Sequence, residues 1–561
     1  MIALALLGTL GVNFYTLAQV VRARTSMLWA DQWVIVQDLE QLAQGHPLWP
    51  ILWAPYWGHR LVIPRLLFLA DSRWLSLASL TWLTLVVQFV HIALLIALAW
   101  LLLRRKSLAL FLIGTVVILN LMLSPFQMEN FVWGMQTMFP LVFMTATAAC
   151  LCLSLASVDK RRPFLVLCIV LGMVSSYSMP NGILVWPALV VQSIYLKQSR
   201  RVVISLASLG TVVIASYLWH YTRPLEMGMG GGGILRHPVD AILLLGLIVG
   251  SAFRFTIPWD VAVGVAAIAV TAAILIHALF ARRNDRRWFS ALFGILLFLL
   301  LSSMSLVAGR LTSKDLHFEG KDLLPVRYFT MICLFWASVA LLALCTSQGR
   351  WLQALALCFY GALLALLMFT SVVRQLTEAE DWADFFVGAD AMGSALILDV
   401  TDEQLLSLFW PNQPEREERT LFLRQNRLAM FHEPRADWPG KRVSDLFPSP
   451  PHPCEGAIEK MVALDGSAWR VEGWAWDGEA ASSPDDILFA DPTGRVIGLA
   501  RGGLRHGYIP GLLLESGPLP SHVRFRHSEW LGYARLPTDS QWAQVKLYGL
   551  FRNEGKVCAI K

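Results

Sequence analysis

Residues 76–125 read SLASLTWLTLVVQFVHIALLIALAWLLLRRKSLALFLIGTVVILNLMLSP, two long apolar runs with the basic residues Arg104, Arg105 and Lys106 between them. An α-helix needs about 20 apolar residues to cross the hydrocarbon core of a bilayer, and both runs approach that length. The stretch therefore predicts two membrane-spanning helices joined by a short basic turn. The same pattern recurs as far as about residue 374, so it decides the fold class.

The overall composition indicates the same class. Of the 561 residues, 56% are apolar and 15% are charged, whereas a typical soluble domain has about 45–50% apolar and about 25% charged residues. The formal net charge of +6 comes from basic clusters between the apolar runs, where such clusters orient membrane helices. The positive net charge therefore does not indicate nucleic-acid binding, and we expect no nucleic-acid partner.

Eleven apolar runs are predicted to span the membrane. The first lacks the basic n-region and small-residue cleavage site of a signal peptide, so we expect it to be retained. The run at 239–253 has about a dozen uninterrupted apolar residues, which is short for a crossing, and it is predicted to be a re-entrant or interfacial helix. The predicted spans are 2–21, 76–103, 107–125, 138–157, 164–179, 182–196, 202–220, 261–281, 288–309, 328–346 and 351–373.

Basic residues between the spans set the predicted orientation. Cytoplasmic loops are enriched in Lys and Arg, and all five basic clusters lie on one side if 239–253 does not cross. The N-terminus is then cytoplasmic and everything beyond residue 374 is periplasmic, in a bacterial inner membrane. Arg22 and Arg24 run against this orientation, because they follow the first span on the outer side. The five clusters are at 104–106, 160–162, 197–201, 282–287 and 350.

The sequence predicts three regions. Residues 1–374 form the transmembrane domain, whose first periplasmic loop (22–75) contains amphipathic helices. Residues 375–455 open with the amphipathic helix TEAEDWADFFVGADAM and are expected to be a mixed α/β linker. Residues 456–561 alternate apolar and polar residues between Asp, Pro and Gly turns, which predicts a small antiparallel β-sandwich-like domain. The fold class is thus an α-helical polytopic membrane protein with a C-terminal soluble α/β region.

Two of the eight cysteines bracket the predicted β-domain. Cys454 and Cys558 lie on either side of it in an oxidising compartment, which predicts a disulfide that closes the domain. The alternative is a pair of free thiols. The other six cysteines lie in apolar runs, where a cysteine is most simply a small packing residue.

Candidate functional residues gather on the predicted outer side. Asp31 follows the first span at membrane-surface depth, where a carboxylate is costly and therefore a functional candidate. His59 and Arg60 lie among many aromatic residues later in the first loop. For these two the simpler alternative is a segment in the headgroup plane, with its aromatics at the interface and its charges in water.

A second candidate group lies in SPFQMENFVWGMQTMFP, where four residues fall within two helical turns. An acid, two amides and an indole suit a sugar-binding surface, because aromatic faces stack on sugar rings and amides bond to hydroxyl groups. A solvated loop with helix-capping residues is the alternative. The four residues are Glu129, Asn130, Trp133 and Gln136.

Two shorter motifs complete the candidate site. Asn181 lies in SYSMPNG, where Pro180 and Gly182 break a helix; such a break is usually a tight turn, but it can also line a cavity. Arg327 and Tyr328 precede a span. Snorkelling and the aromatic belt explain them simply, while recognition of a lipid phosphate is the functional alternative.

Together these motifs resemble the GT-C superfamily of polytopic glycosyltransferases, in particular bacterial members with a C-terminal β-domain. The sequence YWGHR departs from the pattern, since an acidic residue is expected before His59; this leaves any acid/base role at that position in doubt. The motifs that carry the resemblance are ADQW (with Asp31), GHR followed by PRLL, ENFVWGMQ, SMPNG, RYF, GWAWD and DPTGRVIGLA.

The resemblance implies transfer of a sugar from a polyprenyl-phosphate donor to a glycan, lipid or protein acceptor on the outer side. Asp31 would be the general base for the acceptor hydroxyl. Arg327 and Arg60 would stabilise the leaving phosphate, and the other candidate residues would contact substrate. The sequence assigns no metal, because no metal-ligand spacing is evident, although an acidic pair could recruit a divalent ion.

Alternatives remain open at this stage. A transporter or lipid flippase would need internal repeats and ionisable residues near the middle of the membrane, and the sequence has few such residues and no evident repeat. A non-catalytic component of cell-envelope polysaccharide assembly would bind glycan through its β-domain. A polysaccharide polymerase or ligase would have one long mid-chain loop, which the sequence lacks.

Overall fold

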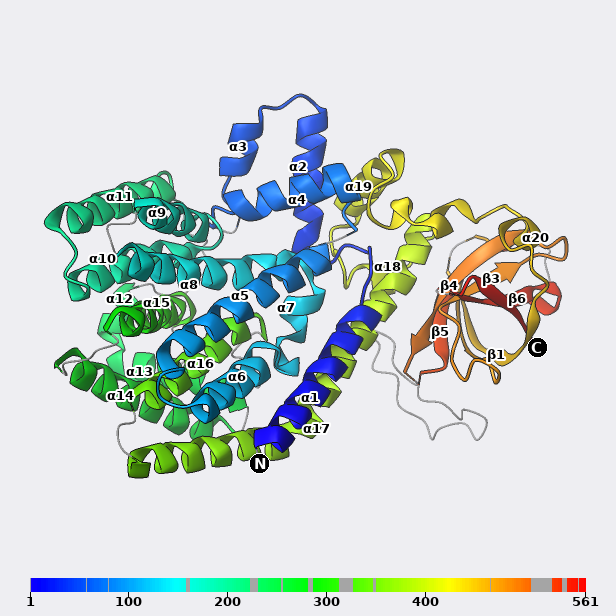
Figure 1. Cartoon of the computed structure of the whole chain (residues 1–561). Helices are drawn as coiled ribbons and strands as arrows, with labels where there is room; N and C mark the ends of the chain where they lie inside the picture. Colours follow the sequence, from blue (N-terminus) through cyan, green and yellow to red (C-terminus); the bar gives the residue numbers. More distant parts are fainter. Residues whose placement is uncertain are drawn as a thin grey trace. The chain divides into compact units, whose positions relative to one another are not determined.

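The computed structural model divides the chain into two compact units, which are described separately below (Figure 1). The first unit comprises Met1–Ala18, Pro47–Leu67 and Thr81–Ala379, and the second comprises Gln19–His46, Phe68–Leu80 and Glu380–Lys561. The structure describes all residues except 1, 57, 79, 158–161, 222–230, 254–255, 281–285, 312–325, 347–349, 465, 506–526, 537–541 and 553.

The first unit is helical throughout its described residues. Among the residues that the structure describes, eight helices are long and apolar enough to cross a bilayer. The helices that lie wholly or partly in this unit are α1 Ile2–Arg22, α3 Leu48–Trp53, α4 Val62–Leu75, α5 Leu80–Leu103, α6 Leu108–Met122, α7 Met128–Val132, α8 Met138–Ala156, α9 Arg162–Ser176, α10 Val185–Tyr195, α11 Arg200–Leu218, α12 Gly231–Arg236, α13 Pro238–Gly250, α14 Ile257–Phe280, α15 Arg286–Arg310, α16 Phe329–Thr346 and α17 Arg350–Ile397.

These eight helices match eight of the eleven runs that the sequence marks as spans. The runs at 164–179 and 182–196 form α9 and α10, which have only 15 and 11 residues. They are short because a 3-10 turn, η4 (Pro180–Leu184), separates them. The run at 351–373 begins the 48-residue helix α17, and the side chains of this part of α17 lie outside the described residues.

Helix α13 contains most of the segment predicted to be re-entrant. Its 13 residues rise about 20 Å, which is less than the ~30 Å of a bilayer core. Glycines bring it into close contact with α14: a Cβ on Gly250 would lie 1.8 Å from the carbonyl oxygen of Asp260, and one on Gly264 would lie 1.8 Å from that of Gly246. The two helices therefore pack with their backbones nearly touching.

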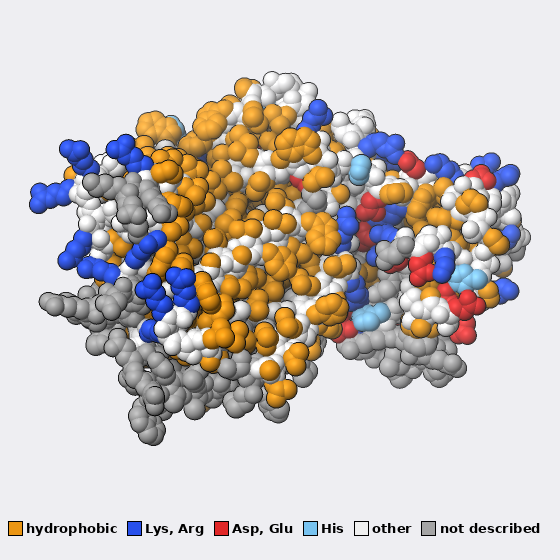
Figure 2. Space-filling view, in the orientation of Figure 1, with side chains coloured by type: hydrophobic (Ala, Val, Ile, Leu, Met, Phe, Trp, Pro, Cys, Tyr) orange, Lys and Arg blue, Asp and Glu red, His pale blue; other side chains and the backbone are white. Residues whose placement is uncertain are grey.

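The first unit has two chemically different ends. Successive helices run in opposite directions, so the loops that carry the basic clusters after α5, α8 and α10 gather at one end, here called the basic end. Arg104, Arg105, Arg162, Arg200 and Arg201 are exposed there. Figure 2 shows Lys and Arg along the left edge of this unit and hydrophobic side chains over the helices beside them. The opposite end, here called the polar end, carries η4 and the turns that flank α7.

The second unit begins with helices and ends in a β-barrel. Within the described residues of 375–455, where a mixed α/β linker was expected, helices and irregular segments precede β1, which begins at residue 452, and one isolated β-bridge joins Arg442 to Arg495. Trp29 packs against Trp382, Phe385 and Phe386 of α17, which ties the start of the first loop to this unit. The helices are α2 Trp33–Ala43, the end of α17, α18 Glu403–Leu406, α19 Gln413–Gln425 and α20 Val443–Leu446.

The β-domain is a closed barrel, and the expected sandwich was wrong. Its strand order is β1-β2-β5-β4-β3-β6-β7, and β1 pairs with β7 in parallel, whereas the other pairs are antiparallel. That parallel pairing closes the described strands into one sheet. Val471, Ile487, Phe489 and Trp530 fill the core. The strands are β1 His452–Ala463, β2 Ala468–Trp476, β3 Asp486–Ala490, β4 Val496–Leu504, β5 Glu529–Arg535, β6 Lys546–Phe551 and β7 Lys556–Ile560.

Candidate functional site

A buried polar cluster lies at the polar end of the first unit. Its backbone follows a sharp path: Ser124 caps the 3-10 turn η2 (Pro125–Gln127), α7 makes little more than one turn, and Trp133 breaks the helix in extended conformation before η3 (Gly134–Thr137). This path turns four polar side chains into the interior, where Thr330 from the start of α16 joins them, and each of the five is at most 6% exposed. We call Gln127, Glu129, Asn130, Gln136 and Thr330 the polar cluster.

Hydrogen bonds connect the members of the polar cluster. Gln136 Nε2 donates to Glu129 Oε1 at 3.1 Å. Asn130 Nδ2 donates to Thr330 Oγ1 at 2.9 Å and to the Arg327 carbonyl oxygen at 3.0 Å. Thr330 Oγ1 in turn donates to Gln127 Oε1 at 2.8 Å. The network joins the turns around α7 to the start of α16.

The cluster also has unused hydrogen-bonding capacity. Asn130 Oδ1, Gln136 Oε1 and Arg327 Nε are buried and have no hydrogen-bond partner among the described residues. Leaving a buried polar atom unsatisfied costs about 1–3 kcal/mol. Two acceptors and one donor left open in this way suit a ligand rich in hydroxyl groups, or ordered water. Glu129 is the one carboxylate of the cluster, so the cluster by itself does not make a divalent-metal site.

A cationic and aromatic group adjoins the cluster. Arg310, at the end of α15, donates to the Tyr328 hydroxyl at 2.8 Å and lies 5.5 Å from the centre of its ring. Tyr328 also contacts Phe139 with ring centres 6.0 Å apart. Of the residues predicted here, Glu129, Asn130 and Gln136 are therefore brought together with Arg327 and Tyr328. Trp133 is buried at the break between α7 and η3.

Arg60 has a different role from the phosphate contact expected of it. The residue is 3% exposed, and its guanidinium group donates to the carbonyl oxygens of Trp53, Tyr217 and Trp219. Its charge also lies 4.7 Å from the centre of the Trp53 ring. Two of these carbonyls belong to the end of α11, where backbone acceptors lack helical partners. Arg60 therefore caps α11 and holds α3 against it.

His59 and Asn181 lie elsewhere in the first unit. Burial lowers the pKa of His59 to about 4, so its imidazole is neutral near pH 7 and offers no charge to a phosphate. Asn181 is half-buried in the turn η4 between α9 and α10. That turn needs the next residue, Gly182, because a Cβ there would lie 1.9 Å from the Ser175 carbonyl oxygen.

Asp31 belongs to the second unit. It is half-buried in the 3-10 turn η1 (Ala30–Gln32), which directly precedes α2. Ala30 adopts a positive φ of 46° at the start of this turn, a conformation that is strained for a residue with a Cβ. Its amide donates to the Phe409 carbonyl oxygen at 2.8 Å, so the turn that carries Asp31 is held in place by the segment after α18.

An ion network around Asp390 was missed by the sequence reasoning. This carboxylate is 1% exposed, and guanidinium groups of Arg435, Arg501 and Arg552 surround it. Burial alone would raise the pKa of Asp390, but the three arginines lower it to about 2. The acids of TEAEDWADFFVGADAM were the available signal. The three arginines around Asp390 are 45 to 162 positions further along the chain, and no local pattern in the sequence pairs them with it.

A second carboxylate on the same helix has the opposite shift. Burial raises the pKa of Asp384 to about 6, although Arg22 and Arg505 both pair with it. His527 Nδ1 lies 3.0 Å from an Arg22 guanidinium nitrogen and 3.9 Å from Asp384 Oδ1. A carboxylate with a raised pKa beside positively charged side chains is a candidate for proton chemistry.

Comparison with models of known protein families, with curated proteins and with solved structures found no match. The resemblance to GT-C glycosyltransferases therefore rests on the sequence motifs alone.

Proposed function

We propose that this chain is an integral membrane protein of the bacterial inner membrane and a glycosyltransferase of the GT-C type. It transfers a sugar from a polyprenyl-phosphate donor to a glycan, lipid or protein acceptor on the periplasmic side. The observation that carries the proposal is the polar cluster, in which an acid, three amides and a hydroxyl are buried at one end of an apolar helical unit with acceptors left open.

Membrane insertion is supported by three features of the first unit. Eight helices have the length and hydropathy of spans, and basic residues gather at one end, as they do on the cytoplasmic side of membrane proteins. Large apolar side chains such as Phe14 and Val86 are 76% and 59% exposed on helix surfaces. Water would be a poor solvent for such a surface, whereas acyl chains would cover it.

The chemistry of sugar transfer divides among a few residues. Hydroxyl groups of the sugar donate to Asn130 Oδ1 and Gln136 Oε1, which are the open acceptors of the polar cluster. Arg327 binds the phosphate that leaves the anomeric carbon. The base is assigned by the resemblance alone: Asp31, which belongs to the second unit, would accept the proton of the attacking hydroxyl. Arg60 we assign to holding α3 and α11, because Nε, Nη1 and Nη2 of its guanidinium group each donate to a backbone carbonyl.

The test is transfer of radiolabel by membranes that contain the full chain, supplied with a panel of labelled polyprenyl-phosphate sugars. Asp31→Asn is expected to lower the rate about 10²–10⁴-fold, which is the usual contribution of a positioned base. Gln136→Ala is expected to lower kcat/KM about 5–150-fold, the equivalent of 1–3 kcal/mol. The matched control is Asp240→Asn, a partly exposed acid in the first turn of α13, which is expected to retain wild-type transfer.

Two results would count against the proposal in different ways. Near-normal transfer by Asp31→Asn would show that Asp31 is not the general base, and it would leave the proposed reaction class unchanged. Absence of transfer from every donor, with the chain present and intact in the membranes, would refute the glycosyltransferase. A polar cluster that serves only folding would lower the amount of protein in Gln136→Ala and leave kcat/KM per molecule unchanged.

A further inference from the structure

Cys454 and Cys558 form a disulfide at the seam that closes the barrel. Their Cα atoms are 5.6 Å apart, with Cys454 on β1 and Cys558 on β7, the two strands that pair in parallel. Both cysteines are buried, and Phe551 packs against them. The bridge links residues 104 positions apart. It is the cysteine pair that the sequence predicts.

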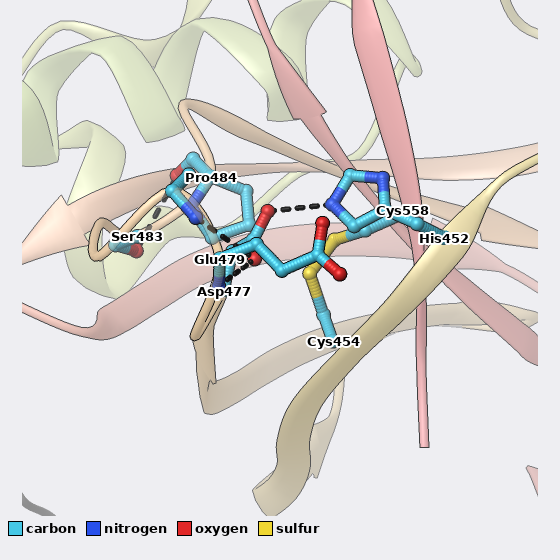
Figure 3. Close-up of a disulfide and its surroundings, with 8 residues drawn as sticks. His452, Cys454, Asp477, Glu479, Ser483, Pro484 and Cys558 are labelled. Atoms are coloured by element: carbon cyan, nitrogen blue, oxygen red, sulfur yellow. Dashed lines mark hydrogen bonds and ion pairs between the residues drawn. A yellow bond between two sulfur atoms is a disulfide. The ribbon is translucent and has the colours of Figure 1, made fainter.

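Two further polar side chains converge on this disulfide. One ligand atom each from His452, Cys454 and Cys558 lies within 4.8 Å of the others, and the imidazole points toward the sulfur atoms (Figure 3). His452 Nε2 also lies 2.5 Å from Asp477 Oδ2. A disulfide that only joins two strands needs no such neighbours, so the arrangement has to be explained separately.

The backbone fixes the orientation of Asp477. Its Oδ1 accepts from the amides of Glu479 at 2.8 Å and Ala480 at 3.2 Å, which leaves Oδ2 directed at the imidazole. The Asp477 side chain is 2% exposed, whereas that of His452 is 26% exposed and can shift. Hydrogen bonds to the carboxylate lower the pKa of Asp477 despite desolvation, so the group is ionised. A buried anion thus lies beside an imidazole and two sulfur atoms.

We propose that reduction of this disulfide creates a zinc site, in which the thiolates of Cys454 and Cys558, the imidazole of His452 and the carboxylate of Asp477 bind Zn²⁺. Thiolate, imidazole and carboxylate are the groups that bind zinc in proteins, and structural sites take four of them in a tetrahedron. Metal–ligand distances of about 2.0–2.3 Å place such ligands roughly 3–4 Å apart. The ligand atoms of His452, Cys454 and Cys558 already lie within 4.8 Å of one another, so small side-chain shifts bring these three to that spacing. Asp477 Oδ2 now lies 2.5 Å from His452 Nε2 and would have to move from the imidazole onto the metal.

The disulfide and the zinc site are alternative states of the same two sulfur atoms. A dithiol or phosphine reductant supplies two electrons to the sulfur–sulfur bond, and each sulfur takes up a proton to become a thiol. Zinc then displaces both thiol protons, because only the thiolate binds the metal. A second disulfide takes the two electrons back by thiol–disulfide exchange, which leaves that disulfide as two thiols, re-forms the Cys454–Cys558 bond and releases the ion. In either state the β1–β7 seam is cross-linked.

The test measures zinc binding by the full-length protein in detergent, before and after reduction with a phosphine, in competition with a chelator of known affinity. We expect one tightly bound Zn²⁺ per chain after reduction and none while the disulfide is intact. Cobalt in place of zinc should give the visible bands of a tetrahedral site and a thiolate charge-transfer band. The matched control, Cys454→Ser with Cys558→Ser, leaves the other six cysteines in place and should bind neither ion.

Single substitutions test the other two ligands. His452→Gln keeps both thiols and should weaken binding by at least tenfold, and Asp477→Asn should weaken it about 10–100-fold. Equal zinc binding by the double serine variant, or by His452→Gln, would overturn the assignment. Absence of zinc binding by reduced wild-type protein would do so as well. Should reduction alone unfold the barrel, zinc must restore its near-ultraviolet circular dichroism, and failure to restore it also overturns the proposal.

Discussion

Replacing Asp390 by asparagine removes the central anion of the ion network in the second unit and keeps the shape of the side chain. The side chains of Arg435 and Arg501 beside it are only 2% and 11% exposed. Removing one partner of a buried ion pair costs about 3–5 kcal/mol, because the other charge stays buried. Glu433 and Asp486 remain as partners of these arginines, so we expect the lower end of this range, about 3 kcal/mol.

The loss is measured as a shift of Tm in the full-length protein. For folded units of about 150–250 residues, 1 kcal/mol corresponds to roughly 2–4 °C, so Asp390→Asn should lower the unfolding temperature of the second unit by about 6–12 °C. Asp399→Asn is the matched control, since this acid follows α17 and is 85% exposed, with arginine nitrogens 3.8 and 3.9 Å away. Exposed pairs contribute about 0–1 kcal/mol. If Asp390→Asn lowers Tm no more than this control, the buried carboxylate is not what stabilises the unit.

Three further outcomes are expected. Replacing Cys454 and Cys558 by serine should cost about 2–5 kcal/mol, seen as a lower Tm of the non-reduced protein; an unchanged Tm would contradict this. Gly250→Val should disrupt the contact with Asp260 and reduce the yield of folded protein in detergent, whereas the same change at Gly309, which has open space around it, should not. Burial raises the pKa of Asp384 to about 6 from 3.8, so the folded state binds its proton more tightly; this contribution is largest below about pH 4 and is lost as the pH rises through about 6. Asp384→Asn should flatten the dependence of Tm on pH over that window, and an unchanged slope would assign the dependence to other groups.

The helical part of the fold could be predicted well, because a run of about 20 apolar residues has few alternatives to a helix. The runs on either side of Arg104 became α5 and α6, separated by the basic turn. The break at Pro180 was also visible in the sequence. The sequence did not show how far this break shortens the two helices beside it: α9 has 15 residues and α10 has 11.

The β-domain could be predicted only as far as its strands. Alternation of apolar and polar residues is the same in a sandwich and in a barrel, so it does not determine whether the sheet closes. Closure depends on β1 meeting β7 in parallel, a pairing across 104 residues between Cys454 and Cys558. The positions of the two cysteines indicated that the ends of the domain meet. They did not indicate the order of the strands between those ends.

The candidate site was predicted only in part, because some of its contacts join segments that are far apart in the sequence. Residues close in sequence, such as Glu129 and Gln136, lie together because one short helix and its flanking turns carry both. Arg60 shows the opposite case. The sequence shows that Arg60 is charged, but the carbonyl oxygens that accept its hydrogen bonds belong to Trp53 and to Tyr217 of α11. No local sequence pattern indicates that these carbonyl oxygens lack helical hydrogen-bond donors.

The parallel pairing of β1 with β7 also determines when the barrel can form during synthesis. Strand β7 pairs with both β1 and β6, and it is the last strand of the barrel to leave the ribosome. Until residues 556–560 have been made and have reached the compartment where the domain folds, β1 and β6 present unpaired edges, which are templates for association with other chains. Closure of this barrel is therefore delayed until its last strand arrives.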